Sequence, residues 1–326
     1  MLVTLALALV IALAWVLPLA AKAQASSGRP DLTGVEIVTH QVTKNIFMLE
    51  ATRDTAGNIG VLIGPEGALI VDNQYQELSP QIEAALAAIG PGRIPYILNT
   101  HHHDDHSEGN ANLSQGIGTR IIAHDRARER LLSRDAAHWP QITFDAGLSI
   151  HFAGERVRVI ALPGGHTDND VVVWFETAGV AHLGDLMNSG TSSFPVADLA
   201  AGGNALLIRD NVAKLLAMLP EDIMIIPGHG PLTNKAELYG LHTMLTETID
   251  LVARKRAQGR ALPDIRAEGL PAPYADWGYG YMNAAGWITM IYASLAASAA
   301  NNETAAEGTS QLKPIPPSTQ TPENDR

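Results

Sequence analysis

The sequence predicts an α/β fold in which strands lead into loops that carry histidine and aspartate. Short runs of Val, Ile and Leu alternate along the chain with longer segments whose apolar residues recur at helical spacing. Several of these short runs are followed within a few residues by His or Asp. Such an alternation is typical of α/β proteins, whose functional side chains often lie on the loops at strand ends.

The composition limits both the architecture and the chemistry. The chain has 326 residues, of which 46% are hydrophobic, and this is enough for one large domain with an extension. Its formal net charge of −12 repels phosphate groups, so we expect a small-molecule substrate and no nucleic acid. There are no cysteines, which excludes disulfides and thiolate ligands. Any metal ion must therefore be held by His, Asp or Glu.

The first 23 residues predict a signal peptide. Residues 1–20 form an apolar run, and Ala21-Lys22-Ala23 is a small-x-small pattern that suits signal peptidase, with Gln24 as the first residue of the mature chain. We therefore expect a periplasmic or secreted protein without a stable membrane association. No Lys or Arg precedes the apolar run, so an uncleaved membrane anchor is the alternative.

Residues 24–44 are expected to form an N-terminal lead-in, with a small and polar beginning. Strand patterns are found at 35–39, 46–49, 60–63 and 68–71. Gly64-Pro65-Glu66-Gly67 joins the last two and predicts a hairpin turn. Apolar residues at helical spacing predict a helix over 78–89, which Gly90-Pro91-Gly92 ends. A short buried strand is expected at 96–99.

The second part of the chain continues this alternation. It predicts strands at 120–123, 148–152, 157–162, 171–175, 180–183 and 223–226, and helices at 125–133, 204–219 and 234–258. A Pro-containing linker (262–273), an aromatic cluster (274–281) and an apolar helix at 283–297 follow. We accordingly expect a catalytic domain at 45–260 and a C-terminal helical extension at 261–300. The polar, Pro-rich segment 301–326 predicts a disordered tail.

The loop after the strand at 96–99 predicts half of a metal site. It reads Asn99-Thr100-His101-His102-His103-Asp104-Asp105-His106, with four histidines and two aspartates in six residues. Imidazole and carboxylate together are a common ligand set for metal ions. In an extended loop alternate side chains point the same way, so His101 and His103 converge while His102 points away. Asp105 and His106 then face a second ion.

Three more candidate ligands follow strand patterns and glycines. They are His166 in Gly164-Gly165-His166, Asp185 in Gly184-Asp185, and His229 in Pro227-Gly228-His229-Gly230. Glycine lets the backbone bend tightly and approach a ligand closely. The set predicts one site of His101, His103 and His166 and another of Asp105, His106 and His229, with Asp185 able to bridge them. Asp72, at the end of an earlier strand, is either a partner of the histidine loop or a turn residue.

This ordered set of motifs resembles the metallo-β-lactamase superfamily, over roughly residues 45–235. Members carry HxHxDH, a later single His, an Asp or Cys, and a final His, in that order. The resemblance implies a four-layer αβ/βα sandwich, in which two sheets pack face to face with helices outside, here with a C-terminal helical extension. It also implies a centre of two zinc ions at one sheet edge, while Mn, Fe or Co suit the same ligands.

The activity that the resemblance implies is hydrolysis of an acyl bond by metal-activated hydroxide. Asp105 is the implied catalytic residue, because it is placed to orient the nucleophile or to receive its proton. Export would bring the enzyme to the compartment where β-lactams meet their target. A β-lactam is therefore the most concrete substrate, and the protein is a candidate metallo-β-lactamase.

Two departures from that family's β-lactamases keep a second substrate class open. Asp185 stands where many of them have a cysteine, and it resembles the bridging aspartate of glyoxalase II. Asn188 stands where many have a lysine that grips the substrate carboxylate. The alternative substrate is thus a thioester, a lactone or an intermediate of sulfur or alcohol oxidation. Asn188, Ser189 and Trp277 are the candidate substrate-binding residues.

A metal-dependent redox or metal-binding protein is the third possibility. The diiron members of the superfamily replace one loop histidine by Glu and carry a flavin domain. This chain has histidine at those places and no room for that domain. The sequence therefore favours a hydrolase.

Overall fold

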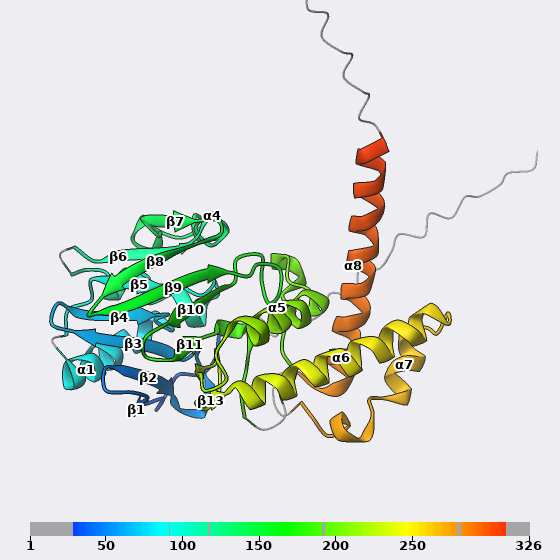
Figure 1. Cartoon of the computed structure of the whole chain (residues 1–326), viewed down its shortest axis with the longest axis horizontal. Helices are drawn as coiled ribbons and strands as arrows, with labels where there is room; N and C mark the ends of the chain where they lie inside the picture. The colour runs from blue at the N-terminus through cyan, green and yellow to red at the C-terminus, as the bar shows by residue number, and fades with distance from the viewer. Residues whose placement is uncertain (1–28, 91, 117, 191–192, 279–281, 311–326) are drawn as a thin grey trace, which may run out of the picture. The chain divides into compact units, whose positions relative to one another are not determined.

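A computed structural model describes residues 29–90, 92–116, 118–190, 193–278 and 282–310 (Figure 1). The predicted signal peptide (1–23) and the end of the predicted tail (311–326) lie outside these residues. The chain divides into two units, 1–33 and 34–326, and the fold described below belongs to the second. Within the described residues, no helix has the length and apolar character needed to cross a membrane.

Two sheets form the centre of this unit. In the described part of the chain, the first has seven strands in the order β1-β2-β3-β4-β5-β6-β7, and the second has six in the order β13-β12-β11-β10-β9-β8. The strands of the first sheet are β1 (Ile37–Gln41), β2 (Ile46–Ala51), β3 (Ile59–Gly64), β4 (Gly67–Val71), β5 (Tyr96–Leu98), β6 (Arg120–His124) and β7 (Ile142–Phe144). Those of the second are β8 (Gly147–Phe152), β9 (Glu155–Ala161), β10 (Val171–Phe175), β11 (Val180–His182), β12 (Met224–Ile226) and β13 (Thr233–Asn234).

Both sheets are mixed, and their parallel strands place loops at a common edge. In the first sheet β4, β5 and β6 run parallel, with Val71 opposite Leu98 and Leu98 opposite Ile122. In the second sheet β11 and β12 run parallel, with His182 opposite Ile226. The residues that follow these strands therefore emerge side by side. The hairpin predicted at 64–67 is confirmed, since Gly64 pairs with Gly67 between β3 and β4.

The two sheets pack face to face around a buried core. Valines 171 and 173 of β10 point into this core, together with Met48, Val71 and Leu98 from the first sheet. Val172 and Trp174 of β10 point the other way and pack under helices. β10 is thus apolar on both faces, as expected for a strand covered on both sides. Each fully buried Val or Leu contributes roughly 1.5–3 kcal/mol to folding.

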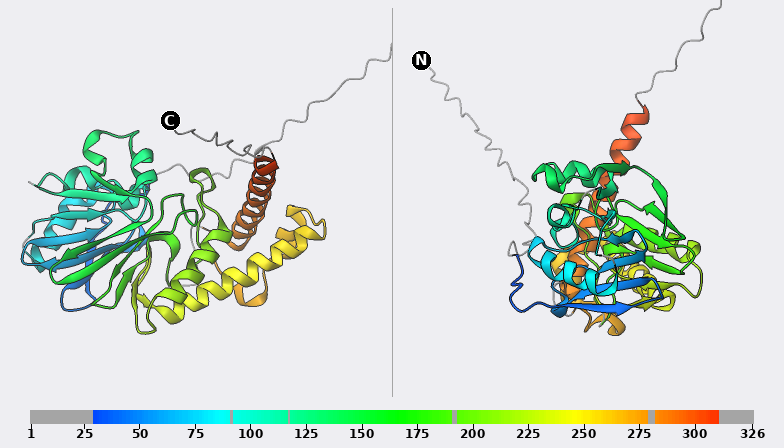
Figure 2. Two further views of the ribbon diagram at one scale, coloured as in Figure 1. Left: turned by 45° about the horizontal axis from the view of Figure 1, so that its top comes forward. Right: turned by 90° about the vertical axis from the view of Figure 1, so that its left-hand side faces the viewer.

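Helices cover the outer faces of the sheets (Figure 2). The helices α1 (Ser79–Ile89), α2 (Asp104–Ser107), α3 (Asn110–Leu113) and α4 (Asp125–Leu131) belong to the first half of the chain. The second half adds α5 (Ala205–Met218), α6 (Lys235–Ala257), α7 (Leu262–Glu268) and α8 (Ala284–Ser310). The predicted four-layer sandwich with C-terminal helices is confirmed by this arrangement.

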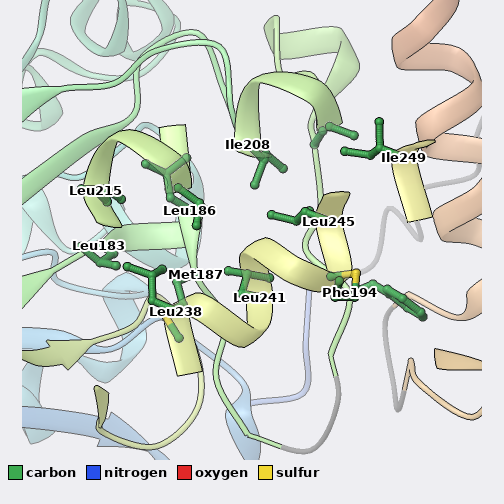
Figure 3. Close-up of a cluster of buried hydrophobic side chains, with 14 of the residues drawn as sticks. Leu183, Leu186, Met187, Phe194, Ile208, Leu215, Leu238, Leu241, Leu245 and Ile249 are labelled. Carbon is green, nitrogen blue, oxygen red and sulfur yellow. The ribbon is translucent and has the colours of Figure 1, made fainter. Parts of the chain in front are cut away.

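A second hydrophobic core joins α5 and α6 to the segment after β11 (Figure 3). Ile208 and Leu215 of α5 face Leu241 and Leu245 of α6, and Leu186 lies between the helices and the sheet. The same cluster includes Trp287 and Ile291 of α8. The C-terminal helices are therefore part of the main fold, because they share its buried core.

The strand predicted at 35–39, within the lead-in (24–44), is confirmed as β1, which pairs with β2. The structure differs from the predicted elements at three other places. The predicted linker at 262–273 contains α7, whose proline falls in its first turn, where the missing N–H has no partner to lose. α8 continues to Ser310, into the predicted disordered tail (301–326), because Ala and Glu favour helix and residues 284–313 contain no proline. β7 was not predicted, since two of its three residues are exposed.

Candidate metal centre

The seven predicted metal ligands lie together at the sheet edge where the parallel strands end. His101 and His103 follow β5, His166 follows β9, and Asp185 and His229 follow β11 and β12. Asp105 and His106 differ from the prediction, because they lie on the short helix α2 and not in an extended loop. The ligand atoms of the two predicted sets each fall within 4.8 Å of one another; the sets are His101, His103 and His166, and Asp105, His106 and His229.

His101, His103 and His166 form what we call the first ligand group, and Asp105, His106 and His229 the second. In the first group, the hydrogen bond of His101 fixes which nitrogen of its imidazole ring carries the proton. The Thr100 hydroxyl donates its only proton to Asp72 Oδ2 over 2.7 Å. Its oxygen must therefore accept a proton from His101 Nδ1, which lies 3.1 Å away. The other nitrogen, His101 Nε2, keeps its lone pair and points into the group.

The two other imidazoles of this group are held in the same way. His166 Nδ1 donates to the Val196 carbonyl over 2.7 Å, and His103 Nε2 donates to Asp198 Oδ2 over 3.0 Å. The lone pairs of His166 Nε2 and His103 Nδ1 therefore also point inwards. His103 Nδ1 lies 2.9 Å from His166 Nε2 and 3.1 Å from His101 Nε2, and no proton is left to form a hydrogen bond between these inner nitrogens. Three converging lone pairs suit a cation, and outer hydrogen bonds of this type are the usual support of metal-binding histidines.

The second ligand group repeats this arrangement with carboxylates. His106 Nδ1 donates to Asp72 Oδ2 over 2.8 Å, and His229 Nδ1 donates to Asp54 Oδ1 over 3.2 Å. His106 Nε2 lies 3.1 Å from Asp185 Oδ1, yet both atoms are buried without a partner in hydrogen-bond geometry. Once His106 Nε2 gives up its proton, two buried lone pairs face a common point, and this arrangement fits a shared metal ion.

Asp185 reaches both ligand groups. Its Oδ2 lies 3.5 Å from His166 Nε2 in the first group, and its Oδ1 lies 3.7 Å from His229 Nε2 in the second. Asp185 also forms a metal-type cluster with His101 and His106, one from each group. A single carboxylate would therefore be able to hold ions in both groups.

Two glycines make room for this close packing. A Cβ on Gly228 would lie 2.0 Å from Asp185 Oδ1, and a Cβ on Gly57 would lie 2.3 Å from the His106 ring. Both contacts are far below van der Waals distance, so no other residue fits without moving a ligand. Gly228 belongs to the predicted motif around His229, whereas Gly57 was not singled out in the sequence.

The charges of the two groups differ. Burial, together with the neighbouring histidines, lowers the pKa of His101 well below its usual value, and burial lowers the pKa of His166 to about 4. In the second group burial acts in the same direction, but carboxylates outweigh it. They raise the pKa of His106 well above its usual value and that of His229 to about 10. Histidines 101 and 166 thus offer neutral imidazoles, whereas a cation in the second group replaces protons.

The structure assigns Asp72 to the support of the histidine loop. Its side chain is fully buried and accepts hydrogen bonds from the Thr100 backbone, the Thr100 hydroxyl and His106. Asp54 and Asp198 play the same part for His229 and His103, and the sequence did not indicate either. Asp198 Oδ1 also accepts hydrogen bonds from the backbone N–H groups of Ala200 and Ala201, as the cap of a short helix does.

The three candidate substrate-binding residues line one cavity of about 400 Å³. Asn188, Ser189 and Trp277 share it with Met187, Gly190, Ser193, Glu237, Gly240 and Leu241. Its wall adjoins the metal centre, because Asn188 pairs with His229 as a β-bridge and Ser189 N donates to the His229 carbonyl over 2.9 Å. Asn188 Oδ1 is buried without a hydrogen-bond partner among the described residues.

Comparisons with known proteins agree with this geometry. Residues 52–229 match the profile of the metallo-beta-lactamase superfamily. A hydroxyacylglutathione hydrolase from Acidiphilium cryptum is 36% identical over 148 residues, which are 45% of this chain and 54% of that protein. One from Brucella ovis is 31% identical over 228 residues, which are 68% of this chain and 82% of that protein. The chain thus spans about half of the first relative and most of the second.

Solved structures share the fold at low sequence identity. A metallo-beta-lactamase from Pontibacter korlensis has a TM-score of 0.56 and 17% identity, covering 65% of this chain and 99% of its own. The stereoselective inverting sec-alkylsulfatase from a Pseudomonas species has a TM-score of 0.64 and 12% identity, covering 78% of this chain and 50% of its own. With the matched profile and the two ligand groups, these likenesses lead to one conclusion. The chain belongs to the metallo-β-lactamase superfamily and is a metal-dependent hydrolase.

Proposed function

We propose that the protein is a hydrolase with two zinc ions that cleaves an acyl bond, with a thioester as its favoured substrate. The observation that carries this proposal is the position of Asp185 between the two ligand groups, within 3.5 Å of His166 and 3.1 Å of His106. A carboxylate in this position would hold both ions near one point, where their Lewis acidity would be available to one water and one substrate.

When bound, two zinc ions supply Lewis acidity, which lowers the pKa of a water toward about 7 and polarises the scissile carbonyl. The protein contributes the geometry. Histidines 101, 103 and 166 are fixed by outer hydrogen bonds, so their inner nitrogens need no reorganisation. Asp105 Oδ2 lies 3.2 Å from His229 Nε2, and its side chain is 22% exposed. Asp105 is therefore reachable by water and placed to orient it or to take its proton.

Two observations favour a thioester. The relatives that cover most of their own length are named hydroxyacylglutathione hydrolases. Among the residues that the structure describes, the cavity beside the metal centre is lined by one charged side chain, Glu237, and by no Lys or Arg. A carboxylate of the substrate therefore meets no cation there, which disfavours a β-lactam as well as the full glutathione moiety. We propose that the portion of the thioester that enters the cavity is uncharged and is bound by Asn188, Ser189 and Trp277.

A β-lactam is the second candidate, and the predicted signal peptide favours it. Export would place the hydrolase in the periplasm or outside the cell, where β-lactams act. The prediction of export has a direct test in the N-terminal sequence of the protein recovered from the periplasm. Cleavage predicts Gln24 as the first residue, and a retained Met1 would contradict cleavage.

The substrate test compares acyl classes on one preparation of known metal content. We expect about two zinc ions per chain and hydrolysis of short uncharged thioesters above that of a hydroxyacylglutathione, a lactone and nitrocefin. EDTA should abolish the activity, and added zinc should restore it. Faster turnover of nitrocefin than of every thioester would contradict the thioester proposal and favour a β-lactam as the substrate. An absence of both metal binding and hydrolysis would overturn the proposed function.

A further inference from the structure

We propose that the C-terminal helix α8 sets the metal affinity of the first ligand group, which consists of His101, His103 and His166. It does so by holding residues 194–205, which we call the anchor segment. This segment lies between α8 and the metal centre, and it carries the outer hydrogen-bond partners of two ligands. The proposal rests on the two-metal centre but not on the identity of the substrate.

The anchor segment is bonded directly to the first ligand group. The Val196 carbonyl accepts from His166 Nδ1 over 2.7 Å, and Asp198 Oδ2 accepts from His103 Nε2 over 3.0 Å. The backbone N–H of Asp198 also donates to the His166 carbonyl over 2.8 Å. A shift of this segment therefore turns two of the three imidazoles of the group.

One face of α8 contacts this segment along its length. Four α8 residues make the contacts, and their spacing of three, four and four places them on one helix face: Trp287, Met290, Ser294 and Ser298. Trp287 stacks on Phe194 at the start of the anchor segment, with ring centroids 5.8 Å apart and planes inclined by 14°.

The polar contacts hold the middle and the end of the segment. Ala197 N lies 3.0 Å from the Met290 sulfur, between the two residues that anchor the ligands. The Ser294 hydroxyl accepts from Ala205 N over 3.0 Å. Asn204 Nδ2 donates to the Ser294 carbonyl over 3.3 Å and to the Ser298 hydroxyl over 3.1 Å. Ser294 is fully buried, so loss of its hydroxyl leaves Ala205 N without this partner.

The coupling is selective for one ligand group. In the second group the outer partners of His106 and His229 are Asp72, which directly follows β4, and Asp54, which ends the short 3-10 helix after β2. Neither of these residues belongs to the anchor segment. A disturbance of α8 should therefore weaken the first group more than the second, whereas a general loss of stability affects both.

The test uses Ser294→Ala with Thr289→Ala as a matched control on the same helix. The Thr289 hydroxyl bonds within the helix, to the Ala285 carbonyl over 2.8 Å, and not to the anchor segment. Asp198→Ala serves as the positive control, because loss of an outer partner typically costs about 10- to 100-fold in metal affinity. The measurements are stepwise zinc affinities by chelator competition, Co²⁺ absorption spectra and the melting temperature of the metal-free protein.

We expect Ser294→Ala to weaken one of the two zinc sites about 3- to 10-fold, since it acts one step beyond an outer partner. The Co²⁺ spectrum should change for the same site that Asp198→Ala affects, and Thr289→Ala should match the wild type. A lower melting temperature with both zinc affinities unchanged would overturn the proposal, as would equal weakening of both sites. Failure of the wild-type protein to bind two ions would overturn this inference and the proposed function together.

Discussion

Asp72 Oδ2 accepts a hydrogen bond from His106 Nδ1 over 2.8 Å, and both side chains are fully inaccessible to solvent. The same oxygen accepts from the Thr100 hydroxyl, which in turn accepts from His101. One carboxylate thus orients a ligand in each of the two groups. Its own backbone has a positive φ of 65°, a conformation that few residues other than glycine adopt without strain.

Replacement of Asp72 should therefore weaken both metal sites. In Asp72→Asn the amide keeps the shape but loses the charge and one acceptor, so His106 and Thr100 lose part of their support. We expect zinc affinity to fall by about 10- to 100-fold, with activity restored in part by excess zinc. Chelator competition and activity at several zinc concentrations test this. If the variant bound zinc with wild-type affinity, Asp72 would not support the metal ligands.

Removal of a single ligand should abolish turnover while the fold is kept. His101→Ala and His229→Ala each take one nitrogen from a different ligand group. We expect hydrolysis to fall by at least about 100-fold, because the catalytic geometry depends on both groups. His151→Ala, at an exposed position on β8, is the matched control and should leave turnover unchanged. Near-normal turnover in either ligand variant would count against the assignment.

The binding of the two metal ions should differ in its dependence on pH. The pKa of His229 is raised to about 10 and that of His106 is raised as well, so both hold protons at neutral pH and must release them to a cation. The pKa values of His101 and His166 are lowered, so these residues are already neutral. The second ion should therefore bind more tightly as the pH rises toward about 10, where His229 loses its proton.

Calorimetric titration of zinc into metal-free protein, in buffers of different ionisation enthalpy, measures this directly. We expect release of protons for one ion and almost none for the other at about pH 7. Equal proton release for both ions would contradict the difference between the groups.

The ion pair of Arg130 with Asp168 should stabilise the loop next to His166 at neutral pH. Arg130 binds both oxygens of Asp168, at 2.8 and 2.6 Å. Burial alone would raise the pKa of Asp168, but the hydrogen bonds from Arg130 and Asn169 lower it from 3.8 to about 2. Because the folded pKa is the lower one, this stabilisation is present above about pH 4 and is lost as the pH falls from 3.8 toward 2.

Asp168→Asn should accordingly lower the free energy of unfolding by about 1 kcal/mol at pH 7, since the pair is partly exposed. The difference from the wild type should shrink as the pH approaches 2. Urea titrations at several pH values measure it. Arg126→Gln is the control, because that arginine is largely exposed and lies 3.5 Å from Asp168. A constant difference at all pH values would exclude the ion pair as its cause.

The sequence was sufficient to predict the candidate ligands but not the residues that support them. His101, His103 and His106 lie within one local motif, and His166, Asp185 and His229 each follow a strand pattern and a glycine. Their convergence follows from the parallel strands, whose ends share one edge. The partners Asp54 and Asp198 lie 175 and 95 residues from the histidines that they hold. Only tertiary packing brings such pairs together, and the sequence contains no local signal for them. The same holds for the contacts of α8 with the anchor segment.

The charge of the cavity beside the metal centre should decide which substrates are accepted. Glu237, at the first turn of α6, is the one charged residue that lines it in the described part of the chain. Glu237→Lys changes the local charge by about two units and should favour substrates with a carboxylate through electrostatic attraction. We expect kcat/KM for a carboxylate-bearing thioester to rise about 5- to 20-fold relative to an uncharged one, mainly through KM. The effect should diminish at high salt.

Asp250→Lys makes the same charge change on α6 but outside the cavity lining. Its selectivity should equal that of the wild type, which separates a local effect in the cavity from a change in net charge. An equal rise for both variants would mean that long-range attraction alone is responsible. If neither variant changes the ratio of the two substrates, the substrate does not occupy this cavity, and the roles proposed for Asn188, Ser189 and Trp277 fail with it.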